Sequence, residues 1–112
     1  MPSLLGPWTL LVIGGVLEMA WAIGFKYVGK DSALWLKAAV GLALAGSMTA
    51  LFLAMRQLPA GTAYAVWTGI GAIGVATIGI FVFREPATVA RVCFLALILV
   101  GIIGLKATSS AS

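Results

Sequence analysis

Residues 8–25 read WTLLVIGGVLEMAWAIGF, a hydrophobic run in which Glu18 is the only charged side chain. A helix of this length rises about 1.5 Å per residue and nearly spans the roughly 30 Å hydrocarbon core of a bilayer. A charge placed at the centre of a bilayer costs about 2.5–3.5 kcal/mol on insertion scales, and such residues usually mark a pathway for ions, protons or substrate. The run therefore predicts a membrane-spanning helix whose central carboxylate has a functional role.

The rest of the chain has the composition of a membrane protein. Of its 112 residues 62% are hydrophobic and 9% are charged, whereas soluble domains carry about 25% charged residues. We expect an all-α membrane protein with four transmembrane helices per chain, forming a single domain over residues 1–112. The predicted spans are residues 8–25, 34–55, 62–83 and 89–105.

The connections between these spans are short, which favours antiparallel neighbours in a compact four-helix bundle. The sequence has no internal repeat, although transporters commonly alternate access by rocking inverted repeats about a central site. Four helices with one intramembrane acid hardly enclose such a site alone. We therefore expect a dimer that brings two copies of Glu18 together, and opposite insertion of the two copies would supply the inversion.

The distribution of Lys and Arg does not favour dual insertion. Five of these residues follow the first and third spans and two lie on the opposite side, which on the positive-inside rule places the first and third loops in the cytoplasm. Several lie at helix ends, where they are weak topology signals. The two groups are Lys26, Lys30, Lys37, Arg84 and Arg91 on one side, and Arg56 and Lys106 on the other.

The first two spans supply candidate partners for Glu18. Gly15 lies on the face of Glu18 and leaves space beside the carboxylate, and Trp21, one turn later, offers an indole N–H. Close helix packing and an aromatic belt are the competing interpretations of these two residues. In the second span, Ser47 is placed to hydrogen-bond Glu18, unless its hydroxyl bonds its own helix backbone.

The third span carries two aromatic residues followed by glycines on one helix face. Tyr64, Trp67, Gly71 and Gly74 recur at spacings of three and four, so they share one helix face. An aromatic face opposite a carboxylate attracts an organic cation. Gly69, Gly71 and Gly74 also predict either a hinge or close packing against a neighbouring helix.

The fourth span carries no polar residue before Lys106. Leu97, Gly101 and Gly104 form a seam that we interpret as a dimer interface, with a lipid-facing scaffold helix as the alternative.

A carboxylate withdrawn from water can hold a proton at one moment and a cation at the next. If both use the same oxygens, exchange of protons for cations follows. The basic residues lie at the ends of the spans, so a structural ion pair buried with Glu18 is not favoured. The sequence has no histidine and no second intramembrane acid, which argues against an enzyme. It shows neither a metal-ligand cluster nor a cofactor motif, and its basic residues form no stripe for nucleic acid.

At these residues the chain resembles the small multidrug resistance transporters. The resemblance rests on LEMAWA at 17–22, Lys26–Tyr27, PAGTAYAVWTGIGA at 59–72 and GIIGLK at 101–106. Trp21, Trp67–Thr68 and the closing Gly-Leu-Lys are similar to the guanidinium exporter subtype. The polyspecific quaternary-ammonium exporters usually have a smaller residue at the position of Trp21.

The resemblance implies a dual-topology homodimer in the inner membrane of a prokaryote that exchanges protons for guanidinium. It implies that Glu18 binds both ligands while Trp21, Ser47, Tyr64 and Trp67 orient it. The uneven charge count leaves a paired heteromeric subunit open. Two further functions remain: a multidrug exporter of quaternary-ammonium or substituted guanidinyl cations, and a non-transporting membrane subunit or assembly factor.

Overall fold

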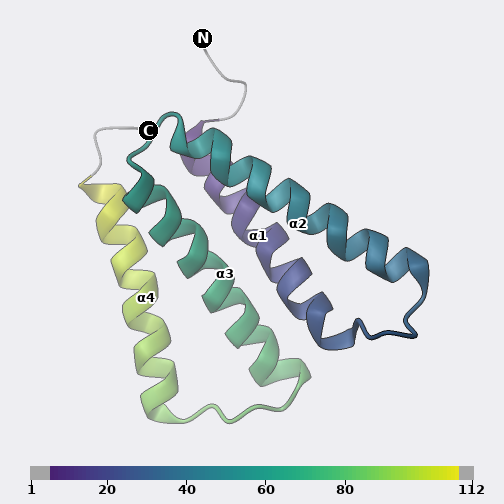
Figure 1. The fold of residues 1–112 in the computed structure, drawn as a ribbon. Helices are drawn as coiled ribbons and strands as arrows, with labels where there is room; N and C mark the ends of the chain where they lie inside the picture. Colours follow the sequence, from purple (N-terminus) through teal and green to yellow (C-terminus); the bar gives the residue numbers. More distant parts are fainter. Residues whose placement is uncertain (1–5, 109–112) are drawn as a thin grey trace.

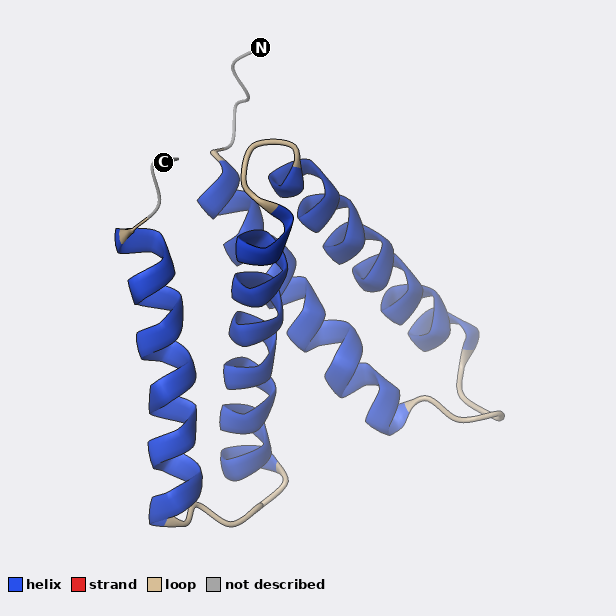
Figure 2. Ribbon diagram, turned by 60° about the vertical axis from the view of Figure 1, so that its left-hand side comes forward, coloured by secondary structure: helices blue, strands red, loops and turns tan. Residues whose placement is uncertain are grey.

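The computed structural model describes residues 6–108, so residues 1–5 and 109–112 of the predicted domain lie outside it. Its helices are α1 (Pro7–Tyr27), α2 (Leu34–Met55), α3 (Ala60–Val82) and α4 (Val89–Ala107) (Figure 1). All four are long and apolar enough to cross a membrane. The described part of the chain contains helices and connecting loops and no strand (Figure 2). The prediction of four transmembrane helices is therefore confirmed.

The helix ends follow from local chemistry. Proline is tolerated in the first turn, where its missing N–H would have no partner in the helix. Pro7 is the first residue of α1, and Pro59 caps the start of α3. The Thr88 hydroxyl accepts a hydrogen bond from the Arg91 amide and so caps α4.

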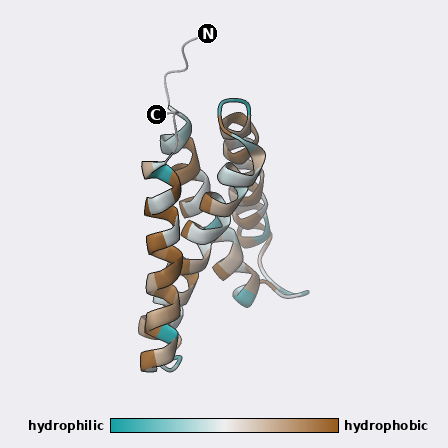
Figure 3. Cartoon of the chain, turned by 90° about the vertical axis from the view of Figure 1, so that its left-hand side faces the viewer, coloured by the Kyte–Doolittle hydropathy of each residue, from teal (hydrophilic) through white to brown (hydrophobic). Residues whose placement is uncertain are grey.

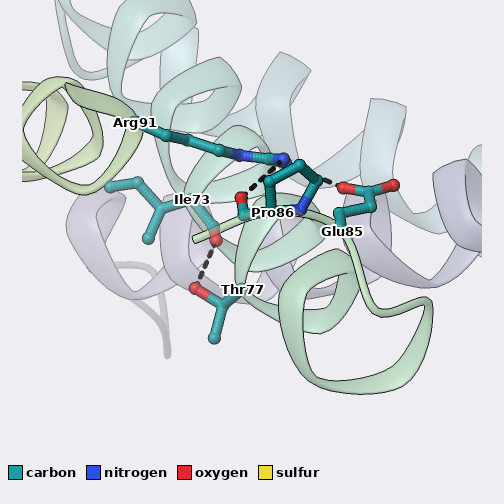
Figure 4. A network of polar contacts seen from close by, with 5 residues as sticks. All are labelled: Ile73, Thr77, Glu85, Pro86 and Arg91. Carbon is teal, nitrogen blue, oxygen red and sulfur yellow. Dashed lines mark hydrogen bonds and ion pairs between the residues drawn. The ribbon is translucent and has the colours of Figure 1, made fainter. Parts of the chain in front are cut away.

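The connection between α3 and α4 is tied down by polar contacts (Figure 4). The Arg91 guanidinium forms an ion pair with the Glu85 carboxylate at 2.8 Å and donates to the Pro86 carbonyl at 3.3 Å. The Glu85 carboxylate lies against Gly79, where an added Cβ would overlap it. These contacts hold the loop at the end of the molecule opposite the described ends of the chain.

The helices do not form a compact bundle, and that expectation is wrong. α1 packs against both α2 and α3, whereas along its length α4 approaches α3 alone. The principal extents of 45 × 37 × 19 Å describe a flattened molecule. α4 has no buried residue, and its residues are largely hydrophobic (Figure 3). Because lipid tails cover apolar side chains as well as other helices do, a membrane helix need not close a bundle.

The buried core occupies one end of the molecule. It joins the first half of α1, the second half of α2 and the first half of α3, with Leu11, Ala54, Ala63 and Val66 almost fully buried. Burial on α1 ends at Gly15, and Glu18 is the next residue on the same face. The carboxylate thus lies where the tightly packed end gives way to helices that spread apart (Figure 2).

Candidate functional site

α1 and α3 run in the same direction and contact each other through a repeated pairing of small and large residues. An added Cβ on Gly14 would lie 3.0 Å from the Trp67 ring, and one on Gly74 would overlap the Met19 side chain. Between these two contacts, Glu18 of α1 lies against Gly71 of α3. The α3 face predicted from Trp67, Gly71 and Gly74 therefore does pack against the helix that carries the acid.

A chain of hydrogen bonds links α1, α2 and α3 beside this contact. The Trp67 indole N–H donates to the Ser47 hydroxyl at 2.9 Å, and that hydroxyl donates to the Gly14 carbonyl at 2.7 Å. Ser47 is 0% exposed and Trp67 is 4% exposed. The network fixes the indole of Trp67 one helical turn from Glu18.

The predicted hydrogen bond between Ser47 and Glu18 is absent from this structure. A serine hydroxyl has one proton to donate, and Ser47 gives it to the Gly14 carbonyl of α1. The alternative that Ser47 bonds its own helix is also wrong, because the acceptor belongs to another helix. Ser47 can act on Glu18 only through the α1 backbone and Trp67.

Two polar atoms near the centre of α1 are buried without a hydrogen-bond partner among the described residues. They are Oε1 of Glu18 and the indole nitrogen of Trp21. The Trp21 ring packs against Phe25, with 5.1 Å between ring centres. A buried polar group left unsatisfied costs about 1–3 kcal/mol. This acceptor and this donor lie about one helical turn apart on α1, and both could still form a hydrogen bond with a group from outside the described residues.

The room for the carboxylate comes from Gly71 rather than from Gly15. An added Cβ on Gly71 would lie 2.5 Å from Cδ of Glu18. The space beside Gly15 is occupied by the Ile70 side chain, which would lie 2.5 Å from a Cβ added to Gly15. Gly15 therefore allows close packing of α1 against α3. The sequence predicts a hinge or packing role for Gly71, and its spacing of four from Trp67 predicts the α3 face on which it lies.

Tyr64 lies beside Trp67, at the edge of the core. Its ring centre lies 5.6 Å from that of Trp67, yet 55% of its surface is exposed. An exposed phenol at this position can contact a ligand or a second protein copy. The orienting roles of Tyr64, Trp21, Ser47 and Trp67 stay predictions.

The remaining glycines separate into packed and open positions. α3 is one continuous helix, and an added Cβ on Gly69 would lie 2.9 Å from the Ile102 side chain of α4, so packing accounts for this glycine without a hinge. An added Cβ on Gly101 or Gly104 meets nothing within 4 Å, and Leu97 is exposed. These three residues are accessible for the predicted dimer interface, which remains a prediction.

The electrostatics of the site favour a cation from outside the chain. Between residues 6 and 108 the structure records the ion pair of Arg91 with Glu85 and none that involves Glu18. A carboxylate in a low-dielectric setting without a basic partner either takes up a proton or attracts a cation. The partly exposed ring of Trp21 adds a surface on which a flat cation can stack.

We expect Trp67→Phe to destabilise the fold. The substitution keeps a ring over Gly14 but removes the N–H that donates to Ser47. Loss of a buried hydrogen bond should lower the free energy of unfolding by about 1–2 kcal/mol, measurable as a lower thermal unfolding midpoint in detergent. Trp35→Phe, at a residue 72% exposed, is the matched control. Equal midpoints for the two variants would contradict the structural role of this bond.

Comparison with known proteins identifies the family of this chain. The family model described as Small Multidrug Resistance protein matches residues 6–98. A protein of Yersinia pseudotuberculosis named "Guanidinium exporter" is 54% identical over 102 residues, covering 91% of this chain and 98% of the relative. A protein of the same name from Escherichia coli K12 is 52% identical over 99 residues, covering 88% and 94% respectively. Another from Proteus vulgaris is 49% identical over 102 residues, covering 91% and 98%.

These matches confirm the resemblance inferred from the residues of the first and third spans. They identify transport proteins rather than enzymes, and they agree with a chain of four membrane-spanning helices. The chain belongs to the Small Multidrug Resistance protein family.

Proposed function

We propose that this protein exports guanidinium in exchange for protons, with Glu18 as the site that both ligands occupy in turn. The observation that carries the proposal is the buried Oε1 of Glu18, which has no hydrogen-bond partner among the described residues and lies one turn from a Trp21 indole in the same condition. Relatives of about half-identical sequence that are named guanidinium exporters support the choice of cation.

The chemistry of guanidinium suits this site. Its planar N–H groups match carboxylate oxygens bidentately, and its flat faces stack on indole rings. Trp21 should also narrow the space beside Glu18, which disfavours a bulky quaternary-ammonium ion. Because proton and guanidinium need the same oxygens, occupancy by one excludes the other, and coupled exchange follows if the protein changes sides only when Glu18 is occupied.

The working unit on this proposal is a homodimer of oppositely inserted copies in the cytoplasmic membrane of a prokaryote. One chain leaves Tyr64 exposed and buries Glu18 only in part. A second copy would complete the site and supply a second carboxylate. The relatives belong to bacteria, and a heteromeric partner would be the alternative second subunit.

Proteoliposomes test the function and separate it from its alternatives. A guanidinium gradient imposed across the membrane should drive proton flux in the opposite direction, and a tetraethylammonium gradient should not. Equal flux with both cations would support a polyspecific exporter. If folded, dimeric protein gave no flux with either cation, both transport functions would be wrong and a non-transporting subunit would remain.

Guanidinium affinity should fall as the pH is lowered. Protons occupy Glu18 as the pH falls. For each bound proton that guanidinium must displace, its apparent affinity falls by up to about tenfold per pH unit. The loss should appear over the range in which Glu18 titrates and level off above it, when the carboxylate is already ionised. Intrinsic tryptophan fluorescence measures the binding. An affinity that rose on acidification would contradict competition.

Dual insertion predicts that one position is reached from both sides of the membrane. A single cysteine at exposed Gln57, in the connection between α2 and α3, should react with a membrane-impermeant maleimide on both faces in a Cys93→Ser background. About half of the molecules should label from each side if insertion is balanced. Labelling from one face alone would reject the dual-topology homodimer and favour a heteromeric pair.

A further inference from the structure

The molecule also has an apolar groove that does not include Glu18. A groove of about 460 Å³ runs between the start of α1, the first half of α3 and the end of α4. Its volume falls within the roughly 300–1,000 Å³ of small-molecule sites. Its walls are aliphatic and aromatic except at one end, where Lys106 lies. The lining residues are Trp8, Val12, Val66, Ile70, Ile102, Ile103, Lys106 and Ala107.

Lys106 is held at the mouth of this groove. Its ammonium nitrogen lies 5.2 Å from the centre of the Trp8 ring, a cation–π contact between the last turn of α4 and the first turn of α1. Both residues lie at the ends of helices that are long and apolar enough to span a membrane, and Trp and Lys at such ends are typical of the headgroup region. The cation is therefore placed at the membrane surface with the apolar groove extending inward from it.

No acidic side chain lies at this end of the protein. The sequence has three acids. Glu18 lies in the middle of α1, and Asp31 and Glu85 lie in the α1–α2 and α3–α4 connections, at the opposite end of the molecule (Figure 1). A negative group that neutralises Lys106 would therefore come from something other than an acidic side chain of the same chain.

We propose that this groove binds one anionic glycerophospholipid, with its phosphate on Lys106 and one acyl chain between α1, α3 and α4. The positive charge at the mouth selects a negative headgroup, and the apolar walls suit hydrocarbon. Basic pockets between transmembrane helices bind anionic headgroups in this manner. The lipid would bridge α4 to α1, two helices that otherwise meet only near their ends.

Native mass spectrometry of the detergent-purified dimer tests the proposal. The protein is titrated with phosphatidylglycerol and, separately, with phosphatidylcholine of the same acyl chains. The first phosphatidylglycerol should bind about fivefold more tightly than phosphatidylcholine, the preference expected of one basic residue near an anionic headgroup. Lys106→Gln should remove that preference.

Arg56→Gln is the matched control. Arg56 lies at the same end of the molecule, at the C-terminus of α2, and its guanidinium carbon is 5.6 Å from the Phe52 ring centre, but it lines no part of this groove. It has the same charge and a similar aromatic neighbour, so its substitution should leave the lipid preference intact. Equal losses in the two variants would show a general charge effect and overturn the proposal.

A second pair of variants tests the acyl chain. Val12→Phe fills the groove without changing charge, whereas Val16→Phe changes an equally exposed residue of α1 outside it. Only Val12→Phe should weaken phosphatidylglycerol binding. The proposal is wrong if neither variant has an effect, or if soluble glycerol phosphate competes as well as the lipid does. It is also wrong if monomers retain lipid and dimers do not, because a second copy would then cover the groove.

Discussion

Glu18→Gln is expected to abolish proton flux driven by a guanidinium gradient. Glutamine keeps the size of the side chain but can neither take up a proton nor carry the negative charge that holds the cation. Removing one member of a buried, hydrogen-bonded charge pair costs about 2–5 kcal/mol, so guanidinium affinity should fall by about 30-fold or more. Flux is measured with a pH-sensitive dye in proteoliposomes and affinity by tryptophan fluorescence.

Glu85→Gln is the control for this experiment. It makes the same chemical change outside the membrane-spanning helices, at a residue that forms a half-exposed ion pair with Arg91. Exposed pairs contribute about 0–1 kcal/mol, so flux should persist. Both variants should remain dimeric. Coupled exchange that survived in Glu18→Gln would show that another group carries the proton.

Gly71→Ala should produce the second largest loss of function. The added Cβ would lie 2.5 Å from Cδ of Glu18, so the carboxylate would have to leave its position against α3. Overpacking of this kind costs about 1–3 kcal/mol, and the displaced oxygens would no longer face the ligand. We expect guanidinium affinity to fall by about tenfold or more, with helix content and dimer formation retained.

Gly41→Ala controls for the loss of a helical glycine. Gly41 lies in α2, and an added Cβ there meets nothing within 4 Å, so affinity should not change. Both substitutions also replace a glycine inside a helix by alanine, which favours the helix by about 1 kcal/mol. This effect is the same in the two variants. If Gly71→Ala bound guanidinium as tightly as Gly41→Ala, Glu18 would not depend on the space at Gly71.

The spans could be predicted closely because each one is a long apolar run with prolines at its borders. α2 occupies the predicted residues 34–55, and the other helices begin and end within about two residues of the prediction. The arrangement of the spans was less predictable. Loop lengths indicate which helices are antiparallel, but they do not report that α1 packs against both α2 and α3, or that α4 reaches the core only through partly buried residues such as Ile102 and Leu105.

The helix faces that carry the candidate site residues could be predicted from the sequence, but the contacts of these residues could not. The spacing of Trp67, Gly71 and Gly74 placed them on one α3 face, and that face does contact α1. Which glycine receives Glu18 depends on the register between two helices, and nothing in either helix alone specifies it. Ser47 illustrates the same limit, because its hydroxyl could reach its own helix, Glu18 or the Gly14 carbonyl, and only the packing selects the last.

The central claim is that proton and guanidinium occupy the same carboxylate. Counting the protons released when guanidinium binds tests it most directly, by titration calorimetry in two buffers of different ionisation enthalpy, at a pH where Glu18 is protonated. We predict net proton release into the buffer on binding, and in Glu18→Gln a binding weaker by about 30-fold or more without proton release. Guanidinium binding that released no protons at that pH would contradict the account.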